Sequence, residues 1–431
     1  MTAHSSSIKI GGPRYAPLTD ATIRAFAAET PALAAKLGGA PAAWRVREVG
    51  DGNLNLVFIV TGPSGGLVVK QALPYVRLVG ESWPLPLERA FFEHEALQRQ
   101  MRHAPGLVPH VHRFDAERAA IVMDYLTPHI ILRKGLIAGT VYPRIADDLA
   151  TFAAETLFRS SDLALPAAEK HAMQALFSQN SALCKITEDL VFTDPYRIAK
   201  LNRWTSPQLD AMAASFRADA ALKIAVQDLK WKFLSQGEAL LHGDLHTGSV
   251  MVTPDDNRVI DPEFAFVGPI GFDIGAMIAN FLLSFFSQDG HEPHEGGRDI
   301  FRAWLLETTE AIWNKFELKF LTLWREHNSG DAFDAGLFED QASAVALEAF
   351  RKKTMARLFT ETMGFAGAKM ARRILGLAHV EDMESISDPD RRARCEKKAL
   401  SLARELMVNA GKIGDAAHLL RLADAARRES A

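Results

Sequence analysis

Residues 240–249 read LLHGDLHTGS, and residues 259–263, beyond a short polar turn, read VIDPE. Each segment is a short apolar run followed by acidic residues, which is typical of a buried strand leading into a loop. A carboxylate at the end of a buried strand is costly unless it is paired, binds a metal or takes part in chemistry. A hairpin through the turn would bring Asp244, Asp261 and Glu263 together. Clustered carboxylates favour a hard divalent cation such as Mg2+.

The same stretch allows two other interpretations. It could be an ordinary buried hairpin whose acids are satisfied internally. Alternatively, His242, Asp244 and His246 alternate along an extended chain, so they could share one face and bind zinc in a hydrolase. We favour the magnesium site over both, because motifs elsewhere in the chain are explained by the same function.

The acidic motifs resemble the catalytic centre of the aminoglycoside phosphotransferase and choline kinase group, within the protein-kinase-like fold. The resemblance implies that Asp244 is catalytic and meets the substrate hydroxyl, while later acids hold Mg2+ on the nucleotide phosphates. Ser249 stands where relatives place a metal-binding Asn, so Asp261 and Glu263 are expected to supply both protein carboxylates. With Pro262 they are also expected to contact ATP. The form HGDLHTGS followed by DPEFAF is similar to the methylthioribose kinases.

A glycine turn, GDGNLN at residues 50–55, lies between predicted strands at 44–49 and 56–61, and a third predicted strand ends at Lys70. Glycines let backbone amides approach phosphates, and a lysine adds positive charge there. Taken alone, this pattern is more typical of an ordinary hairpin, but the acidic motif downstream favours a nucleotide site. The resemblance implies that Asn53 and Lys70 contact ATP.

Residues 88–101 have the pattern of a helix, in which Glu95 is expected to pair with Lys70 and orient it. Glu93 is the second choice for this role. Glutamates on exposed helix faces are often only solvated, so the sequence leaves open whether either forms the pair.

The resemblance implies an α+β, bilobal fold, with a small antiparallel-sheet lobe over residues 1–126 and a larger, mainly helical lobe over residues 127–431. Asp124, Tyr125 and Leu126 would join the lobes and bind ATP through backbone groups. Helical periodicity dominates the second lobe. Helices are expected around residues 145–158, 167–177, 207–234 and 300–324, with two more after residue 389.

Two further blocks carry the narrower resemblance. Residues 75–87 are too proline-rich for a helix and are similar to the tryptophan loop of methylthioribose kinases, with Trp83 in it. The resemblance implies that Arg372 and Arg373 contact the sugar and the transferring phosphoryl group, which suits the planar guanidinium. Adjacent helix residues point about 100° apart, so we expect these two arginines to differ in burial. Asp273 is expected to cap the following helix and to support the catalytic loop.

Whole-chain properties narrow the function further. The 431 residues carry a formal net charge of -4, so no basic excess indicates a nucleic acid or a membrane surface as partner. Two cysteines, Cys184 and Cys395, are too few for a disulfide framework and fit a reducing cytoplasm. The N-terminus lacks the apolar core of a signal peptide, and the longest apolar segment, residues 274–286, is expected to form a buried helix.

The resemblance to methylthioribose kinases in these three blocks implies an enzyme that uses ATP and Mg2+ to phosphorylate the 1-hydroxyl of 5-methylthioribose, giving 5-methylthioribose 1-phosphate in methionine salvage. The alternatives are an aminoglycoside or choline-type phosphotransferase and a nucleotide-binding pseudokinase. Paired arginines suit a neutral sugar that gains a phosphate better than they suit a cationic substrate. The resemblance also implies a homodimer.

Overall fold

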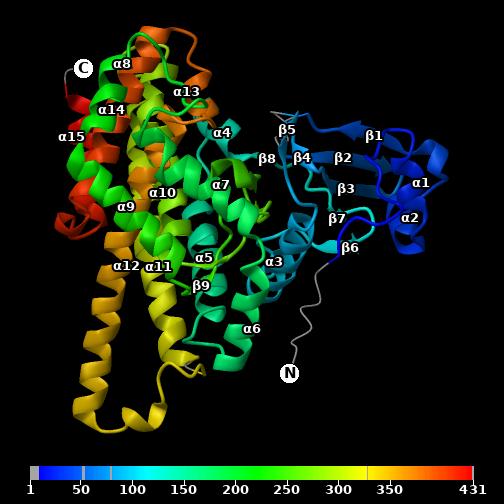
Figure 1. Cartoon of the computed structure of the whole chain (residues 1–431), viewed down its shortest axis with the longest axis horizontal. Helices are drawn as coiled ribbons and strands as arrows, with labels where there is room; N and C mark the ends of the chain where they lie inside the picture. The colour runs from blue at the N-terminus through cyan, green and yellow to red at the C-terminus, as the bar shows by residue number, and fades with distance from the viewer. Residues whose placement is uncertain (1–8, 51–53, 78–79, 328, 430–431) are drawn as a thin grey trace. The chain divides into compact units, whose positions relative to one another are not determined.

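The computed structural model describes residues 9–50, 54–77, 80–327 and 329–429. The predicted nucleotide contact Asn53 lies outside the described residues. The chain divides into two compact units, both drawn in Figure 1. The first unit contains Met1–Pro128 together with two short segments from further along the chain, Asn180–Leu183 and Ile260–Ala265, and the second contains the rest.

The first unit is built around a five-stranded sheet in the order β1-β2-β3-β7-β6, in which every neighbouring pair is antiparallel. The segment around Trp83 forms a two-stranded ribbon, and no helix occurs in its described residues. The elements of this unit are α1 (Ile23–Ala28), α2 (Pro31–Leu37), β1 (Arg45–Glu48), β2 (Asn55–Gly62), β3 (Gly65–Ala72), β4 (Tyr75–Val76), β5 (Gly80–Pro84), α3 (Arg89–His103), β6 (Val111–Asp115) and β7 (Ala120–Asp124).

Different helices cover the two faces of this sheet, because side chains alternate along each strand. Val122 of β7 packs in a cluster with Phe26 of α1 and Leu37 of α2. Its neighbours Ile121 and Met123 pack with Leu97 of α3. The sheet therefore holds α3 against the opposite face from α1 and α2.

The second unit is mainly helical, so the α+β prediction is confirmed. Its helices are α4 (Leu132–Ala138), α5 (Ile145–Arg159), α6 (Ala167–Phe177), α7 (Ser181–Phe192, which starts in the first unit), α8 (Asp210–Ala218), α9 (Ala220–Ser235), α10 (Ile270–His291), α11 (Asp299–Glu326), α12 (Gln341–Leu375), α13 (Glu381–Glu384), α14 (Pro389–Val408) and α15 (Ala416–Arg428). Its strands are β8 (Ile130–Ile131), β9 (Ala239–Leu240), β10 (Val250–Val252), β11 (Asn257–Val259) and β12 (Val267–Gly268).

Helix α10 forms the core of the second unit. It packs against α11, α12 and α14, and every residue from Ile270 to Gln288 is buried. By length and composition α10 would be able to cross a membrane, with a mean hydropathy of 1.6, but that stretch is entirely enclosed by the protein. The predicted buried helix at residues 274–286 is confirmed.

Strand pairing around the acidic motif differs from the prediction. β10 and β11 form the antiparallel hairpin, whereas β9, the strand before Asp244, pairs with β12. The hairpin predicted to join the strands before Asp244 and Asp261 is therefore wrong. The apolar run at residues 250–252 forms a strand of its own next to the turn, and the strands nearest a tight turn are the ones it pairs.

Candidate functional site

Lys70 lies at the centre of a buried group of charges in the first unit. It sits within β3, opposite Val57 of β2 and Ile121 of β7. Its Nζ is 2.8 Å from a carboxylate oxygen of Glu93 on α3 and also forms an ion pair with Asp261. Burial opposes the charge, but the surrounding carboxylates outweigh it, so the pKa of Lys70 is raised. Lys70 is therefore a cation at neutral pH.

The partner of Lys70 on α3 is Glu93, so the prediction of Glu95 is wrong. The Glu93 side chain is 3% exposed, on the face of α3 that meets the sheet. Glu95 instead pairs with Arg99 one turn further along α3, at 2.5 Å. Positions two apart on a helix point about 200° away from each other, so only one of the two glutamates can face β3.

Asp261 and Glu263 complete this group of charges. Asp261 has a φ of 72°, a left-handed conformation that Asp adopts more readily than most residues. Its side chain is 46% exposed, whereas Pro262 and Glu263 are buried. Glu263 accepts a 2.7 Å hydrogen bond from Asn55 Nδ2 and lies 3.8 Å from Arg89 Nε. One carboxylate is thus open to a ligand and the other is anchored.

The carboxylates of Glu93, Asp261 and Glu263 offer oxygen atoms that all lie within 4.8 Å of one another. Burial raises the pKa of Glu263, and repulsion from Asp261 adds to this effect. Three carboxyl groups surround Lys70 and Arg89 here, and an all-oxygen set suits a hard divalent cation. The Asp261 side chain is 46% exposed and that of Glu93 only 3%, so Asp261, with Glu263 beside it, is the carboxylate that such a cation can reach.

The zinc alternative finds no support in the described part of the chain, where His242, Asp244 and His246 do not form a group spaced for a metal. The ring nitrogens shape the loop instead. His242 Nδ1 accepts a 3.3 Å hydrogen bond from the backbone N–H of Asp244. His246 Nδ1 accepts a 2.9 Å hydrogen bond from the backbone N–H of Gly248.

Asp124, which is predicted to bind ATP through its backbone, is the last residue of β7. Tyr125 and Leu126, with the same predicted role, follow it directly. The Asp124 carboxylate lies 2.7 Å from Lys36 Nζ and 2.8 Å from His112 Nε2. Burial would raise the pKa of Asp124, but these partners outweigh it and the pKa is lowered. Tyr125 and Leu126 are half-buried. The backbone N–H of Asp124 is also paired, because it donates to the backbone oxygen of His110 at 3.0 Å.

In the second unit, Asp244 lies on the loop that follows β9. Asp273 holds the backbone of this loop. The Asp273 carboxylate accepts hydrogen bonds from the backbone N–H groups of His242, at 2.6 Å, and Gly243, at 3.0 Å. Gly243 has a φ of 84°, which favours glycine. Helix α10 already begins at Ile270, so Asp273 lies in its first turn and the predicted capping role is wrong. Its carboxylate supports the loop instead.

Lys369, Arg373 and His246 surround the Asp244 carboxylate. Lys369 Nζ of α12 lies 2.8 Å from Oδ1, and Arg373 Nη2 lies 3.8 Å from Oδ2. His246 Nε2 lies 3.3 Å from Oδ2. Burial would raise the pKa of Asp244, but these neighbours outweigh it and hold the pKa well below its ordinary value. At neutral pH the carboxylate is an anion, so it is a weak proton acceptor but a good hydrogen-bond acceptor for a hydroxyl group.

Arg372 and Arg373 are both buried, at 9% and 7% exposure. The expected difference in burial is wrong, because α12 is enclosed on all sides from Glu361 to Leu375. Arg372 Nε and Nη1 and Arg373 Nε have no hydrogen-bond partner among the described residues. Buried guanidinium N–H groups are normally paired, so these unused donors fit an anionic ligand.

Three further charged residues of this cluster, Lys369, Arg133 and Asp382, were not predicted from the sequence. Lys369 lies three and four residues before the two arginines, a helical spacing that would have identified it. Arg133 of α4 places its Nε 3.1 Å from Asp382, which is fully buried on α13. That contact is tertiary and has no sequence signature. With the two arginines, four cations face three carboxylates, those of Asp244, Asp273 and Asp382, which leaves a positive surplus for an anion.

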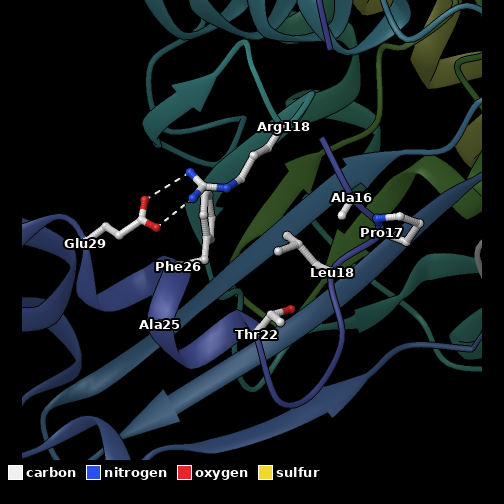
Figure 2. Close-up of a pocket in the computed structure, with 8 residues that line it drawn as sticks. All are labelled: Ala16, Pro17, Leu18, Thr22, Ala25, Phe26, Glu29 and Arg118. Carbon is white, nitrogen blue, oxygen red and sulfur yellow. Dashed lines mark hydrogen bonds and ion pairs between the residues drawn. The ribbon is translucent and has the colours of Figure 1, made fainter. Parts of the chain in front are cut away.

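The pocket in Figure 2 lies elsewhere in the first unit and has a volume of about 220 Å³. Arg118 crosses it, donating to both carboxylate oxygens of Glu29 at 3.0 and 2.7 Å. The guanidinium lies 5.2 Å from the ring centre of Phe26. None of the predicted site residues lines this pocket, so it is separate from the charged clusters.

A buried lysine facing a carboxylate pair, together with an aspartate on a His-Gly-Asp loop, is the residue set of a phosphotransferase with a kinase-like fold. Residues 45–304 match the family model described as "Phosphotransferase enzyme family".

Comparison with individual relatives identifies the family within this class of phosphotransferases. Methylthioribose kinase 1 of Oryza sativa subsp. japonica is 49% identical over 394 residues, which cover 91% of each chain. Methylthioribose kinase of Escherichia coli O45:K1 is 45% identical over 397 residues, covering 92% of this chain and 94% of the relative. The chain therefore belongs to the methylthioribose kinase family. Among solved structures, an ethanolamine kinase of Plasmodium vivax matches with a TM-score of 0.43 and 11% identity, covering 86% of this chain and 84% of that chain.

Proposed function

We propose that this protein transfers the γ-phosphoryl group of ATP to the 1-hydroxyl of 5-methylthioribose, giving 5-methylthioribose 1-phosphate for methionine salvage. The observation that carries the proposal is the Asp244 cluster, in which an ionised carboxylate lies among buried arginines with unused N–H groups. Phosphoryl transfer to a neutral sugar requires a carboxylate that accepts a hydrogen bond from the hydroxyl group. It also requires guanidinium groups that donate to the phosphate oxygens.

In the first unit, Lys70 binds the nucleotide phosphates and Glu93 orients it. Asp261 and Glu263 hold Mg2+, which when bound neutralises charge on the phosphate oxygens. Pro262, which lies between these two residues in the sequence, contacts the nucleotide. Asn53 and the backbone of residues 124–126 bind the rest of the nucleotide. The proposal is supported by the group of carboxyl oxygens around Asp261 and by its 46% exposure, which leaves this carboxylate accessible.

In the second unit, Asp244 orients the sugar hydroxyl. Because its pKa is held well below the ordinary value, it takes up the proton only as the new oxygen–phosphorus bond forms. Arg372 and Arg373 stabilise the charge on the transferring group, for which the guanidinium fork is suited. A largely dissociative phosphoryl transfer needs orientation more than a strong base, so a weakly basic carboxylate suits this task.

We further propose that the protein is a cytoplasmic homodimer. Ile224, Trp231 and Leu234 lie at spacings that share one face of α9 and are 73%, 72% and 59% exposed. A second copy would bury them. Cys184 and Cys395 are unpaired thiols, which suits a reducing compartment. Light scattering at micromolar concentration should give twice the chain mass, and a monomer would contradict the dimer.

A substrate comparison tests the proposed reaction. ATP consumption by the purified protein with Mg2+ should be high with 5-methylthioribose and near background with kanamycin or choline. Chelation of the divalent cation should abolish it. Asp244→Asn should lower kcat by about 10²–10⁴-fold, because the neutral amide orients the hydroxyl poorly. Turnover with kanamycin or choline instead would favour the other phosphotransferases, and tight ATP binding without any turnover would favour a pseudokinase.

A further inference from the structure

We propose that Lys369 and His246 are positioning residues that fix the orientation of the Asp244 carboxylate, each holding one of its two oxygens. The inference rests on the proposed function, since it concerns how Asp244 meets the sugar hydroxyl. His246 was considered only as a zinc ligand and Lys369 was not predicted from the sequence, so the acidic motif alone gives neither residue this role. Lys369 comes from α12, and His246 lies on the loop that carries Asp244.

Lys369 is confined to a single position. Its side chain is 3% exposed, and Nζ lies 2.8 Å from Asp244 Oδ1 and 4.6 Å from the ring centre of Phe272. A buried ammonium is costly unless it has a carboxylate or an aromatic face as partner, and Lys369 has both. Phe272 directly precedes Asp273, whose carboxylate holds the backbone of the catalytic loop. The same turn of α10 therefore fixes the loop and the lysine that pairs with it.

The hydrogen-bond partners of His246 determine which ring nitrogen carries the proton. Nδ1 accepts from the backbone N–H of Gly248 at 2.9 Å and lies 3.1 Å from Ser249 Oγ. Nδ1 is therefore an acceptor, and the proton is on Nε2, which lies 3.3 Å from Asp244 Oδ2. Burial lowers the pKa of His246 to about 3, so the ring is neutral at working pH. It donates to the carboxylate without cancelling its charge.

These two contacts give Asp244 a defined direction. With Oδ1 held by an ammonium and Oδ2 by an imidazole N–H, the carboxylate cannot rotate freely, and the remaining lone pairs point at a fixed place. The other charged groups near it are Arg372 and Arg373 of α12 and Arg133 of α4, with Asp382 of α13 beside the arginines and Asp273 of α10 near Lys369.

Lys369→Met tests the first contact, because methionine keeps the length of the side chain without its charge. We expect kcat with 5-methylthioribose to fall about 100-fold, within the range for loss of a positioned acid–base group. KM for the sugar should stay within about threefold, because the loss falls on the transition state. The variant should also shift the acidic limb of the pH profile of kcat to higher pH. Removing a cation raises the pKa of Asp244, and the ionised, active form is then lost at higher pH.

Lys170→Met is the matched control. Lys170 is also fully buried, 3.1 Å from Asp162, but it lies outside the charged cluster around Asp244. Its replacement should lower thermal stability without shifting the acidic limb of the pH profile of kcat. A general effect of losing a buried lysine is thereby separated from an effect on Asp244.

A pair of substitutions at His246 keeps the inference testable if Lys369→Met does not fold. His246→Gln retains an N–H donor near the position of Nε2, whereas His246→Leu does not. The glutamine variant should keep most of kcat, and the leucine variant should lose about tenfold or more. Equal kcat in both His246 variants, or an unchanged kcat and acidic limb in folded Lys369→Met, would overturn this inference. An inactive wild-type protein would instead overturn the proposed function.

Discussion

At the scale of single residues, Lys70 shows how one buried cation keeps several carboxylates together. Glu93, Asp261 and Glu263 lie close enough to repel one another, and Lys70 is the ammonium among them. Burial raises the pKa of Glu93, and repulsion from the other two acids adds to it, while Lys70 lowers it. A cation bound at Asp261 would relieve the same repulsion. The lysine is thus expected to keep this group in place before the nucleotide arrives.

Exchanging the two glutamates of α3 for glutamine tests this arrangement. Glu93→Gln should lower kcat/KM for ATP by about tenfold, because Lys70 loses its buried partner and is less well oriented. Glu95→Gln is the matched control and should leave kcat/KM unchanged, since Glu95 pairs with Arg99 and not with Lys70. Steady-state kinetics with varied ATP measure both. A larger loss in the Glu95 variant would contradict the assignment.

Residue types and spacing predicted part of this site. The acids at 244, 261 and 263 were identifiable because each follows a short apolar run. Choosing between Glu93 and Glu95 depends on the rotation of α3 about its axis, which its mixed apolar and charged pattern did not define. Arg133 and Asp382 could not be found at all. Their contact joins two helices far apart in the chain, and neither lies in a recognisable motif.

At the scale of elements, glycines allow α12 to pack closely. A Cβ on Gly367 would come within 2.4 Å of the backbone oxygen of Ala403 on α14. A Cβ on Gly364 would come within 2.7 Å of Leu229 Cδ2 on α9. The first neighbour is a rigid backbone, whereas the second is the end of a side chain that can turn away. The two positions on one helix therefore differ in what they tolerate.

Alanine substitutions should reveal this difference. Gly367→Ala should lower the free energy of unfolding by about 1–3 kcal/mol, because α12 and α14 must move apart. Gly364→Ala should be nearly neutral, because the gain of about 1 kcal/mol in helix propensity offsets the adjustment of Leu229. Urea denaturation of the two variants beside the wild-type protein measures both values. Equal losses would show that backbone contact does not limit the packing of α12.

Helical periodicity predicted most helices but not the breaks between consecutive helices. Residues 207–234 were expected to be helical, and they contain two helices, α8 and α9. Asp219 separates them, because its side chain accepts a 3.0 Å hydrogen bond from the backbone N–H of Leu222 and caps α9. The first half of α12 was not predicted. It is largely exposed and rich in alanine, so it has no apolar stripe to reveal it.

At the scale of the whole molecule, the two units are interleaved along the chain. Asp261 and Glu263 belong to the first unit, although they lie between segments of the second. The first unit therefore lacks both proposed metal ligands until the chain has been made well beyond residue 128. The sequence could not show this, because pattern reasoning assigns contiguous stretches to a domain. A segment of six residues carries too little periodicity to be assigned on its own.

The enclosure of α10 has a consequence for how the protein is made. A ribosome releases this apolar helix well before α12 and α14, which later cover it. During that interval the nascent chain presents a surface that other proteins or a lipid bilayer can bind. A chain stopped at residue 335 should therefore be insoluble or remain bound to chaperones, whereas a chain that lacks only α15 should stay soluble. Sedimentation of both truncated chains after expression measures this, and a soluble, chaperone-free product ending at 335 would show that α10 finds sufficient cover from the earlier helices α4, α5 and α11.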